Sequence, residues 1–158
     1  MPTLASLASS LGQVGNFLAV VLGFSLIIVL HELGHFVAAR WAKIRVLAFA
    51  VGFGPALFSF RKGLGWRLGS SESEYNQAKK SWTAGTGQRN PEGISTTEYR
   101  LNALPFGGYV KMLGQEDIDP TARSNEPDSY QNCKPWKRMI VISAGVIANV
   151  VTAAILFV

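Results

Sequence analysis

Two long apolar segments without charge limit what this chain can fold into. No Lys, Arg, Asp or Glu occurs in residues 1–30, and none occurs in residues 139–158. About 20 consecutive apolar residues in a helix cross a hydrocarbon core of about 30 Å, and both segments are long enough. We therefore expect a polytopic α-helical membrane protein with two transmembrane helices, one over residues 13–42 and one over residues 138–158.

The first apolar segment has a competing interpretation as a secretory signal peptide. Such a peptide begins with positive charge and ends in a cleavage site of small residues. Residues 1–13 contain no Lys or Arg, and the ionisable pair His31 and Glu32 follows the apolar stretch. The residues therefore favour a membrane helix.

Charge is concentrated between the two apolar segments. All 15 Lys and Arg lie between Arg40 and Arg138, together with nine of the ten acidic residues. Because basic residues gather on the cytoplasmic side of membrane helices, we expect a multi-pass protein of the inner cell membrane. Its central segment would be cytoplasmic and its N-terminus outside. The basic residues flank the apolar segments and do not alternate with aromatic platforms, so we expect the lipid bilayer as a partner and no nucleic acid.

Two stretches of the central segment have the composition of β strands. Residues 44–60 are rich in β-branched and aromatic side chains, and Gly52, Gly54 and Pro55 interrupt any helical pattern. Residues 98–112 begin with alternating polar and apolar side chains, which is the period of a strand. We expect these two stretches to form a small sheet.

Two further stretches are polar and poor in aliphatic residues. Residues 61–97 are dense in Gly, Ser, Thr, Gln, Asn and Lys, and residues 113–135 are acidic at their start and interrupted by Pro. Such composition does not support a packed core. Both stretches are predicted as flexible cytoplasmic loops.

The run His31-Glu32-Leu33-Gly34-His35 is an HExxH motif. Positions i and i+4 share one helix face, so His31 and His35 can bind one Zn²⁺. Zinc lowers the pKa of a bound water from about 15.7 towards about 7, and Glu32 is close enough to be the catalytic base. A pair of histidines near lipid headgroups without metal is the alternative. Ionisable side chains in a membrane helix cost about 2.5 to 3.5 kcal/mol each, which favours the zinc site.

Three features carry a resemblance to a known family. They are the HExxH motif in the first membrane helix, the Gly-Phe-Gly stretch after it, and the run Leu-Pro-Phe-Gly-Gly-Tyr-Val-Lys-Met at residues 104–112. Over residues 14–60 and 98–158 the chain resembles the bacterial site-2 protease family, in the branch of the regulator of sigma-E protease. The resemblance implies a zinc-dependent intramembrane endopeptidase for single-span membrane proteins, such as an anti-sigma factor already cut outside the membrane or a leftover signal peptide.

The same resemblance implies a place for the sheet. It would re-enter the membrane from the cytoplasmic side beside the zinc, and Gly52 and Gly54 would let the backbone of a substrate approach. An extended substrate needs such a sheet edge because unpaired backbone groups in lipid cost several kcal/mol each. The alternative, a small cytoplasmic sheet with turn glycines, stays open.

Asn149 is the one strongly polar side chain of the second apolar segment. The family has Gly-Pro-x-x-Asn here, with the Asn near the active site, where it binds substrate or the reacting water. In this chain Val146 replaces the proline, which puts the family's local kink in doubt. An interhelical hydrogen bond is an equally good interpretation of an intramembrane Asn.

A third zinc ligand is missing from the pattern, although catalytic zinc usually has three protein ligands. The resembling family takes it from an Asp in a Leu-Asp-Gly motif on a later membrane helix, after PDZ domains that are absent here. We therefore expect a truncated product, a fragment, or half of a split enzyme whose C-terminal half supplies this ligand. Alone, the chain would bind zinc weakly and cleave little. A non-catalytic membrane module that binds substrates and a metal carrier are the alternatives.

Overall fold

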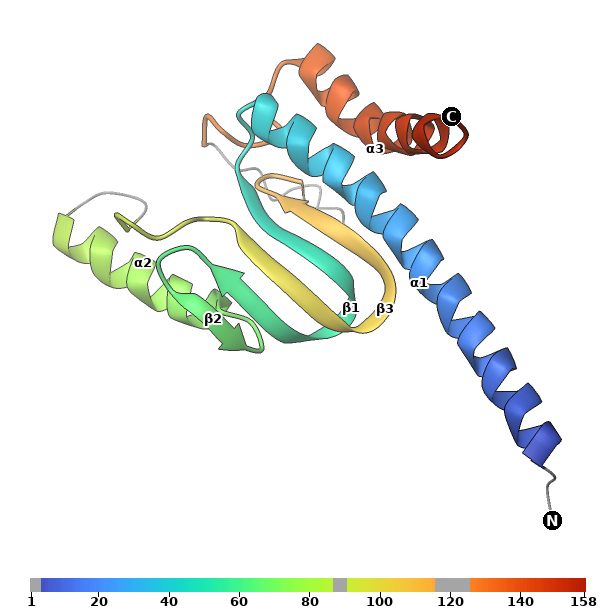
Figure 1. Cartoon of the computed structure of the whole chain (residues 1–158). Helices are drawn as coiled ribbons and strands as arrows, with labels where there is room; N and C mark the ends of the chain where they lie inside the picture. Colours follow the sequence, from blue (N-terminus) through green and yellow to red (C-terminus); the bar gives the residue numbers. More distant parts are fainter. Residues whose placement is uncertain (1–3, 87–90, 116–125) are drawn as a thin grey trace.

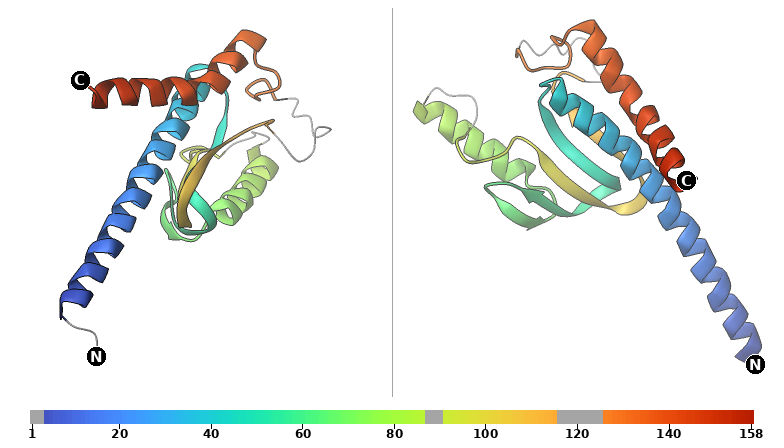
Figure 2. Two further views of the ribbon diagram at one scale, coloured as in Figure 1. Left: turned by 90° about the vertical axis from the view of Figure 1, so that its right-hand side faces the viewer. Right: turned by 45° about the horizontal axis from the view of Figure 1, so that its top comes forward.

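The computed structural model describes residues 4–86, 91–115 and 126–158, with side chains from Gly12 onward. The chain forms, in order, α1 (Leu4–Trp41), β1 (Val46–Arg61), β2 (Gly65–Leu68), α2 (Glu72–Thr86), β3 (Glu98–Met112) and α3 (Pro135–Leu156). The sheet lies between α1 and α2, and α3 crosses α1 near the C-terminal end of α1 (Figures 1 and 2).

Helices α1 and α3 are both long and apolar enough to cross a membrane, over Gly12–Trp41 and Pro135–Leu156. Each helix begins earlier than the sequence predicted. The Ser, Ala and Leu residues before residue 13 are compatible with helix, and a proline fits the first helical turn because no N–H is needed there. Helix α1 ends at Trp41, and the following Lys43 has a positive φ of 65°.

Small residues allow α1 and α3 to approach closely. A Cβ atom on Gly34 would lie 2.5 Å from the carbonyl oxygen of Ala144 and 2.8 Å from the Cβ of Ala148. Such small contacts are typical of helices that associate in membranes. Beside this crossing lies the core of the molecule, formed by Ala38, Ala39, Ala42, Ile44, Val46, Met112 and Val141.

The sheet consists of three strands in the order β2-β1-β3, and its two long strands each fold back on themselves (Figure 1). Residues 48–51 of β1 pair with residues 108–111 on one side and with residues 98–101 on the other. Residues 58–60 of β1 pair with the other side of β3, and β2 pairs with the end of β1. One arm of each bent strand therefore lies between the two arms of the other.

The two folds in the strands lie next to each other and next to α1. Gly52 and Gly54 bend β1 with φ of 82° and 86°, a region that favours glycine. The side-chain amide of Asn102 donates to the carbonyl oxygen of Gly52 at 2.8 Å. In the bend of β3, the carbonyl oxygen of Pro105 accepts a hydrogen bond from the hydroxyl of Ser25 in α1. The bends therefore reach the middle of α1.

The prediction of a flexible loop over residues 61–97 is wrong for most of its length. The stretch contains β2 and the 15-residue helix α2, while residues 87–90 lie outside the described part. Two acidic residues in the first turn suit the helix dipole, and Tyr75 is buried under the guanidinium of Arg61, 4.3 Å from its ring centroid. Polar contacts with the sheet stabilise this helix, and composition alone does not reveal them. Within 113–135, residues 116–125 lie outside the described part.

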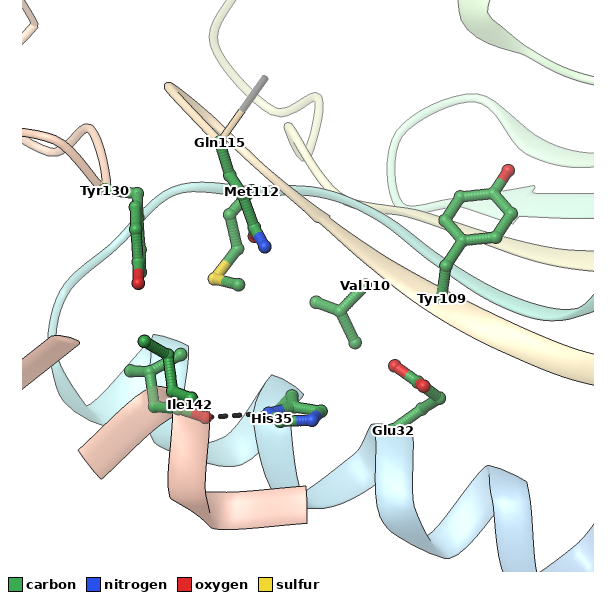
Figure 3. A pocket seen from close by; sticks show the side chains of 9 residues that line it. Glu32, His35, Tyr109, Val110, Met112, Gln115, Tyr130 and Ile142 are labelled. Atoms are coloured by element: carbon green, nitrogen blue, oxygen red, sulfur yellow. Dashed lines mark hydrogen bonds between the residues drawn. The ribbon is translucent and has the colours of Figure 1, made fainter. Parts of the chain in front are cut away.

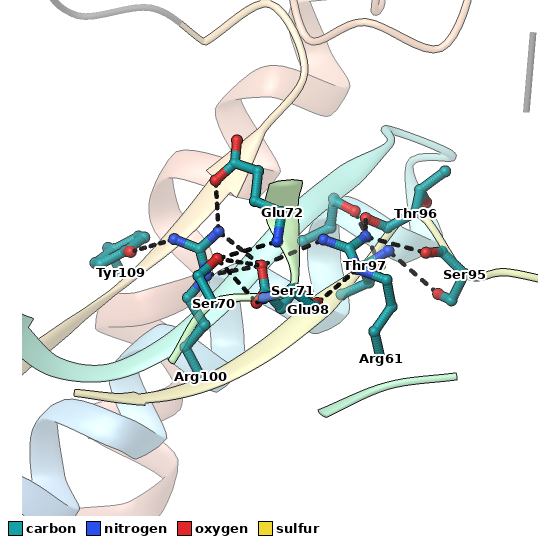
Figure 4. A network of polar contacts seen from close by, with 11 residues as sticks. Arg61, Ser70, Ser71, Glu72, Ser95, Thr96, Thr97, Glu98, Arg100 and Tyr109 are labelled. Carbon is teal, nitrogen blue, oxygen red and sulfur yellow. Dashed lines mark hydrogen bonds and ion pairs between the residues drawn. The ribbon is translucent and has the colours of Figure 1, made fainter. Parts of the chain in front are cut away.

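A buried polar network joins α2 to the sheet (Figure 4). The carboxylate of Glu98 is fully buried and accepts hydrogen bonds from the backbone N–H of Ser71 at 2.6 Å, from Arg61 at 3.2 Å and from Arg100 at 2.6 Å. Burial alone would raise the pKa of Glu98, but the hydrogen bonds from Arg100 and Ser71 outweigh it and lower the pKa to about 2. Glu98 is therefore charged at neutral pH.

Candidate zinc site

Both histidines of the HExxH motif lie on the face of α1 that meets α3. Their rings stand nearly perpendicular, at 78°, with centroids 4.9 Å apart. The Nε2 atoms of His31 and His35 are 3.2 Å apart. Two ligands at about 2.0 to 2.1 Å from one tetrahedral zinc ion are separated by about this distance. The expected i, i+4 pair is therefore already convergent.

Helix α3 fixes the orientation of His35. Its Nδ1–H donates to the backbone carbonyl oxygen of Val141 at 2.7 Å. A neutral imidazole that donates from Nδ1 keeps its lone pair on Nε2. The lone pair of His35 therefore points towards His31. Such a hydrogen bond from the far ring nitrogen is the usual support of a metal-binding histidine.

Asn149 gives His31 the same kind of support. Its side-chain amide lies 3.1 Å from Nδ1 of His31, and its buried Oδ1 has no partner. With the amide turned over, Oδ1 would accept the Nδ1–H of His31, which satisfies that oxygen and leaves Nε2 free. In that arrangement both Nε2 lone pairs would face each other at 3.2 Å, and a cation between them would remove their repulsion. The donor set therefore fits a divalent metal such as zinc.

Gly145 is what allows α3 to approach the two rings. A Cβ atom at this position would lie 2.5 Å from Nε2 of His31 and closer still to Nε2 of His35. Any side chain at Gly145 would therefore enter the space between the two Nε2 atoms. This role of Gly145 depends on the crossing of two helices about 110 residues apart and has no local signal in the sequence.

A cavity of about 430 Å³ adjoins Glu32 and His35. It lies between α1, α3 and the end of β3, and Figure 3 shows the carboxylate of Glu32 and the ring of His35 at its edge. The Cγ atom of Glu32 would be 3.3 Å from a Cβ atom on Gly108, so this glycine gives the carboxylate room. Apolar and polar side chains complete the wall, from Val110, Met112, Gln115, Tyr130, Val141 and Ile142.

The predicted site residues fall into two groups in the structure. His31, Glu32, His35 and Asn149 lie together, but Gly52 and Gly54 lie in the bend of β1, where their nearest contacts are with Leu104 and Asn102. A substrate-binding role for these two glycines stays a prediction. Among the described residues, no group of three or more His, Cys, Asp and Glu side chains could hold a metal ion, so the histidine pair is an incomplete ligand set.

Comparisons with known proteins agree with this geometry. Residues 19–68 and 91–158 match the profile of peptidase family M50, and residues 69–90, which contain all of α2, lie outside the match. A relative from Campylobacter jejuni is 34% identical over 143 residues, 90% of this chain and 30% of its own length. One from Clostridium perfringens is 36% identical over 138 residues, 87% of this chain and 30% of its own length. Both carry the name "Putative zinc metalloprotease". The chain thus spans less than a third of the relatives that it matches.

Proposed function

The chain belongs to peptidase family M50, and from this premise we propose that it carries part of the active site of a zinc-dependent endopeptidase that cuts single-span membrane proteins within the bilayer. The observation that carries the proposal is the pair of Nε2 atoms 3.2 Å apart, each on a ring whose Nδ1 is bonded to α3. At this distance both nitrogens can bind one zinc ion, once Oδ1 of Asn149 faces Nδ1 of His31.

Each residue of the site has a role in this proposal. His31 and His35 hold the zinc ion, which when bound lowers the pKa of a coordinated water towards neutrality. The carboxylate of Glu32 faces the adjoining cavity, where it accepts the proton of the attacking water and passes it to the leaving amine. Asn149 holds the ring of His31, and a contact of its amide with substrate stays a prediction. The third ligand comes from a C-terminal part of the protein.

The position of the histidines along α1 supports a reaction inside the membrane. His35 lies six residues and His31 ten residues before Trp41, or about 9 and 15 Å along the axis at 1.5 Å per residue. Trp41 stacks edge-on against Trp136, and the ammonium of Lys137 lies over both rings. Aromatic and basic residues of this kind mark the membrane surface. The zinc site would then lie close to the centre of the bilayer.

The same distance argument supports a membrane re-entrant sheet. Ser25, which bonds the bend of β3, lies 16 residues before Trp41, or about 24 Å along the axis. Residues 46–60 and 101–110 contain no charged side chain. Phe53, Leu104 and Phe106 are exposed at the bends. In water these side chains would be unfavourable, whereas lipid accommodates them.

One edge of the sheet suits an extended substrate. Residues 108–112 pair with the start of β1 on one side only, and within the described part no strand pairs with their other side. Val110 and Met112 of this edge line the cavity that Glu32 faces. A substrate strand added here would satisfy its backbone groups and present a peptide bond to Glu32. Gly52 and Gly54 would contribute by shaping the nearby bend.

The topology proposed with this function follows the charges. The basic residues beside Trp41 and Trp136 support a cytoplasmic location for the segment between α1 and α3. The N-terminus would then be outside, in an inner-membrane protein that crosses the bilayer several times. An anti-sigma factor already cut outside the membrane, or a leftover signal peptide, has the single-span form that the site requires.

A non-catalytic substrate-binding module is the second candidate. The observation that favours it is the incomplete ligand set of the described residues. Such a module would use the free edge of β3 to bind extended segments without cutting them. The enzyme proposal requires Glu32 for cleavage, whereas a binding module does not cleave its partner at all.

The decisive experiment measures cleavage of a single-span substrate in membranes by the full-length product of the gene. Glu32→Gln should abolish cleavage while the purified protein keeps its zinc, because the histidines are intact. Glu92→Gln, at an exposed position outside the site, should cleave at the normal rate. Normal cleavage by Glu32→Gln would overturn the enzyme proposal. Loss of zinc on His35→Phe with normal cleavage would do the same.

A further inference from the structure

The two faces of the sheet have opposite chemistry. On one face lie the charged side chains that contact α2, where Arg67 pairs with Glu74 at 2.9 Å and Arg100 with Glu72 at 2.7 Å. Side chains alternate between the faces of a strand. The other face is accordingly apolar in the same strands, and it carries Phe49, Phe58, Phe60, Trp66, Leu68, Tyr99 and Leu101.

Helix α1 covers only part of the apolar face. Phe36 of α1 packs against Phe49 and Tyr99, with ring centroids 5.3 and 6.0 Å apart. Beyond these contacts Trp66 and Leu68 of β2 are 74% and 83% exposed. An edge strand with large exposed apolar side chains is an aggregation hazard in water. This patch therefore needs an apolar environment.

The register of the sheet gives the depth of the patch. A straight row across the strands joins Phe36 of α1 to Trp66 of β2 through Phe49, Tyr99 and Phe60. Phe36 lies five residues before Trp41, or about 7.5 Å inside the apolar span. Leu68 pairs with Phe58, two residues nearer the bend, which is about 7 Å deeper.

Helix α2 supplies counter-charges to arginines that lie at this depth. The register that places Trp66 inside the span places Arg67 and Arg100 at nearly the same level, on the opposite face. Charged side chains at membrane depth need counter-charges or water. Glu74 and Glu72, both on α2, supply carboxylates to these two arginines.

We propose that the apolar face of residues 58–68 contacts lipid directly. In this arrangement β2 lies in the cytoplasmic leaflet with Trp66 and Leu68 among acyl chains, while α2 covers the opposite, water-facing side of the sheet. The proposal rests on α1 crossing the membrane, as in the proposed function. It goes beyond that function because the whole of α2 lies outside the family match and because the patch is separate from the zinc site.

Fluorescence quenching tests the placement with the four tryptophans of the chain. Four single-tryptophan variants, with the other three replaced by Phe, are reconstituted in phosphatidylcholine and phosphatidylglycerol vesicles that contain acyl-brominated lipid. Trp66 should lose at least as large a fraction of its emission as Trp41, and Trp82 on α2 should lose little. Equal quenching of Trp66 and Trp82 would overturn the proposal. If Trp41 and Trp136 escape quenching as well, the membrane placement of α1 fails with it.

Thiol labelling provides a second measurement that needs no tryptophan exchange. In a Cys133→Ser background, Leu68→Cys and Asn76→Cys place thiols on β2 and on α2. A membrane-impermeant maleimide should label Leu68→Cys at least about tenfold more slowly than Asn76→Cys. A rise of one unit in the thiol pKa would by itself lower the reactive thiolate fraction by about this factor. The difference should vanish in denaturing detergent. Equal labelling of Leu68→Cys and Asn76→Cys in intact bilayers would overturn the proposal, because the patch would then lie in water.

Discussion

The sheet contacts α1 on one side and α2 on the other, and the two sides are stabilised by opposite means. Where α1 meets α3 beside the sheet, small residues such as Gly34 and Gly145 let backbones and imidazole rings approach within contact distance. Where α2 meets the sheet, a buried carboxylate and several arginines form a hydrogen-bonded network.

The difference predicts which changes each side tolerates. A site that depends on close approach fails when one methyl group is added, because packed backbones have no room to move. A site that depends on a buried ion pair fails when one partner is removed, because the other charge is left unpaired. Size should therefore be critical at the zinc site and charge critical at α2.

Gly145→Ala should have the largest effect. The added Cβ would enter the space between the Nε2 atoms of His31 and His35, so we expect zinc affinity to fall by more than the roughly 10- to 100-fold typical of changes around a metal site. Zinc content of the purified full-length protein and competition with a chelating dye measure this. Gly23→Ala, on α1 with nothing within 4 Å of the new Cβ, is the matched control. Normal zinc binding by Gly145→Ala would show that size is not critical.

Glu98→Gln should have the next largest effect, on stability. It removes the buried negative charge between Arg61 and Arg100, and breaking a buried pair in this way costs about 3 to 5 kcal/mol. Denaturant unfolding in detergent measures the loss. Zinc affinity should stay normal, because the network does not touch the histidines. A loss below about 1 kcal/mol would mean that charge does not hold α2.

The pH dependence of unfolding also tests whether the charge on Glu98 stabilises the fold. Because the folded pKa of Glu98 is lowered to about 2 from an ordinary value of 4.5, its contribution is fully present above about pH 4.5. It is lost as the pH falls from there towards 2. The wild-type chain should lose stability over this window more steeply than Glu98→Gln. Parallel pH profiles of the two proteins would contradict this assignment.

The arrangement of the HExxH residues was largely predictable from sequence, because it is local. His31, Glu32 and His35 lie within five residues, and a helix alone brings the two imidazoles to one face. The support from α3 was predictable only in part. Asn149 is conspicuous as a polar residue in an apolar segment, but its contact with His31 depends on how two distant helices cross.

Helix α2 and the pairing of the bent strands could not be predicted from sequence, because their contacts are not local. Tyr75 of α2 is buried by Arg61 of β1, and neither residue carries a signal of this in its own neighbourhood. Residues 48–51 pair with two separate parts of β3, about 50 and 60 residues further along the chain. Alternation of polar and apolar residues predicts a strand, but it does not choose that strand's neighbours.

Asn149→Ala should have a moderate effect on the zinc side. It removes the hydrogen bond to Nδ1 of His31 but leaves both ligands and the helix contact in place, so we expect zinc affinity to fall by about 10-fold or more. Thr152→Ala, one turn later with a bond only to its own helix, is the control. If zinc affinity is unchanged in Asn149→Ala, the residue is free to act on substrate alone.

The smallest effect is expected at the rim of the α2 side. Arg67 and Glu74 form an ion pair at 2.9 Å, but their side chains are 41% and 48% exposed. Solvent screens such a pair, so a double-mutant cycle with Arg67→Gln and Glu74→Gln should give a coupling of about 0.2 to 1 kcal/mol in detergent. In lipid bilayers the coupling should rise if β2 lies in the cytoplasmic leaflet, because fewer water molecules then reach the guanidinium of Arg67. A coupling in detergent as large as the roughly 3 kcal/mol of a buried pair would mean that the rim is as sensitive to charge as the centre of the network, and the contrast between Glu98 and Glu74 would be lost.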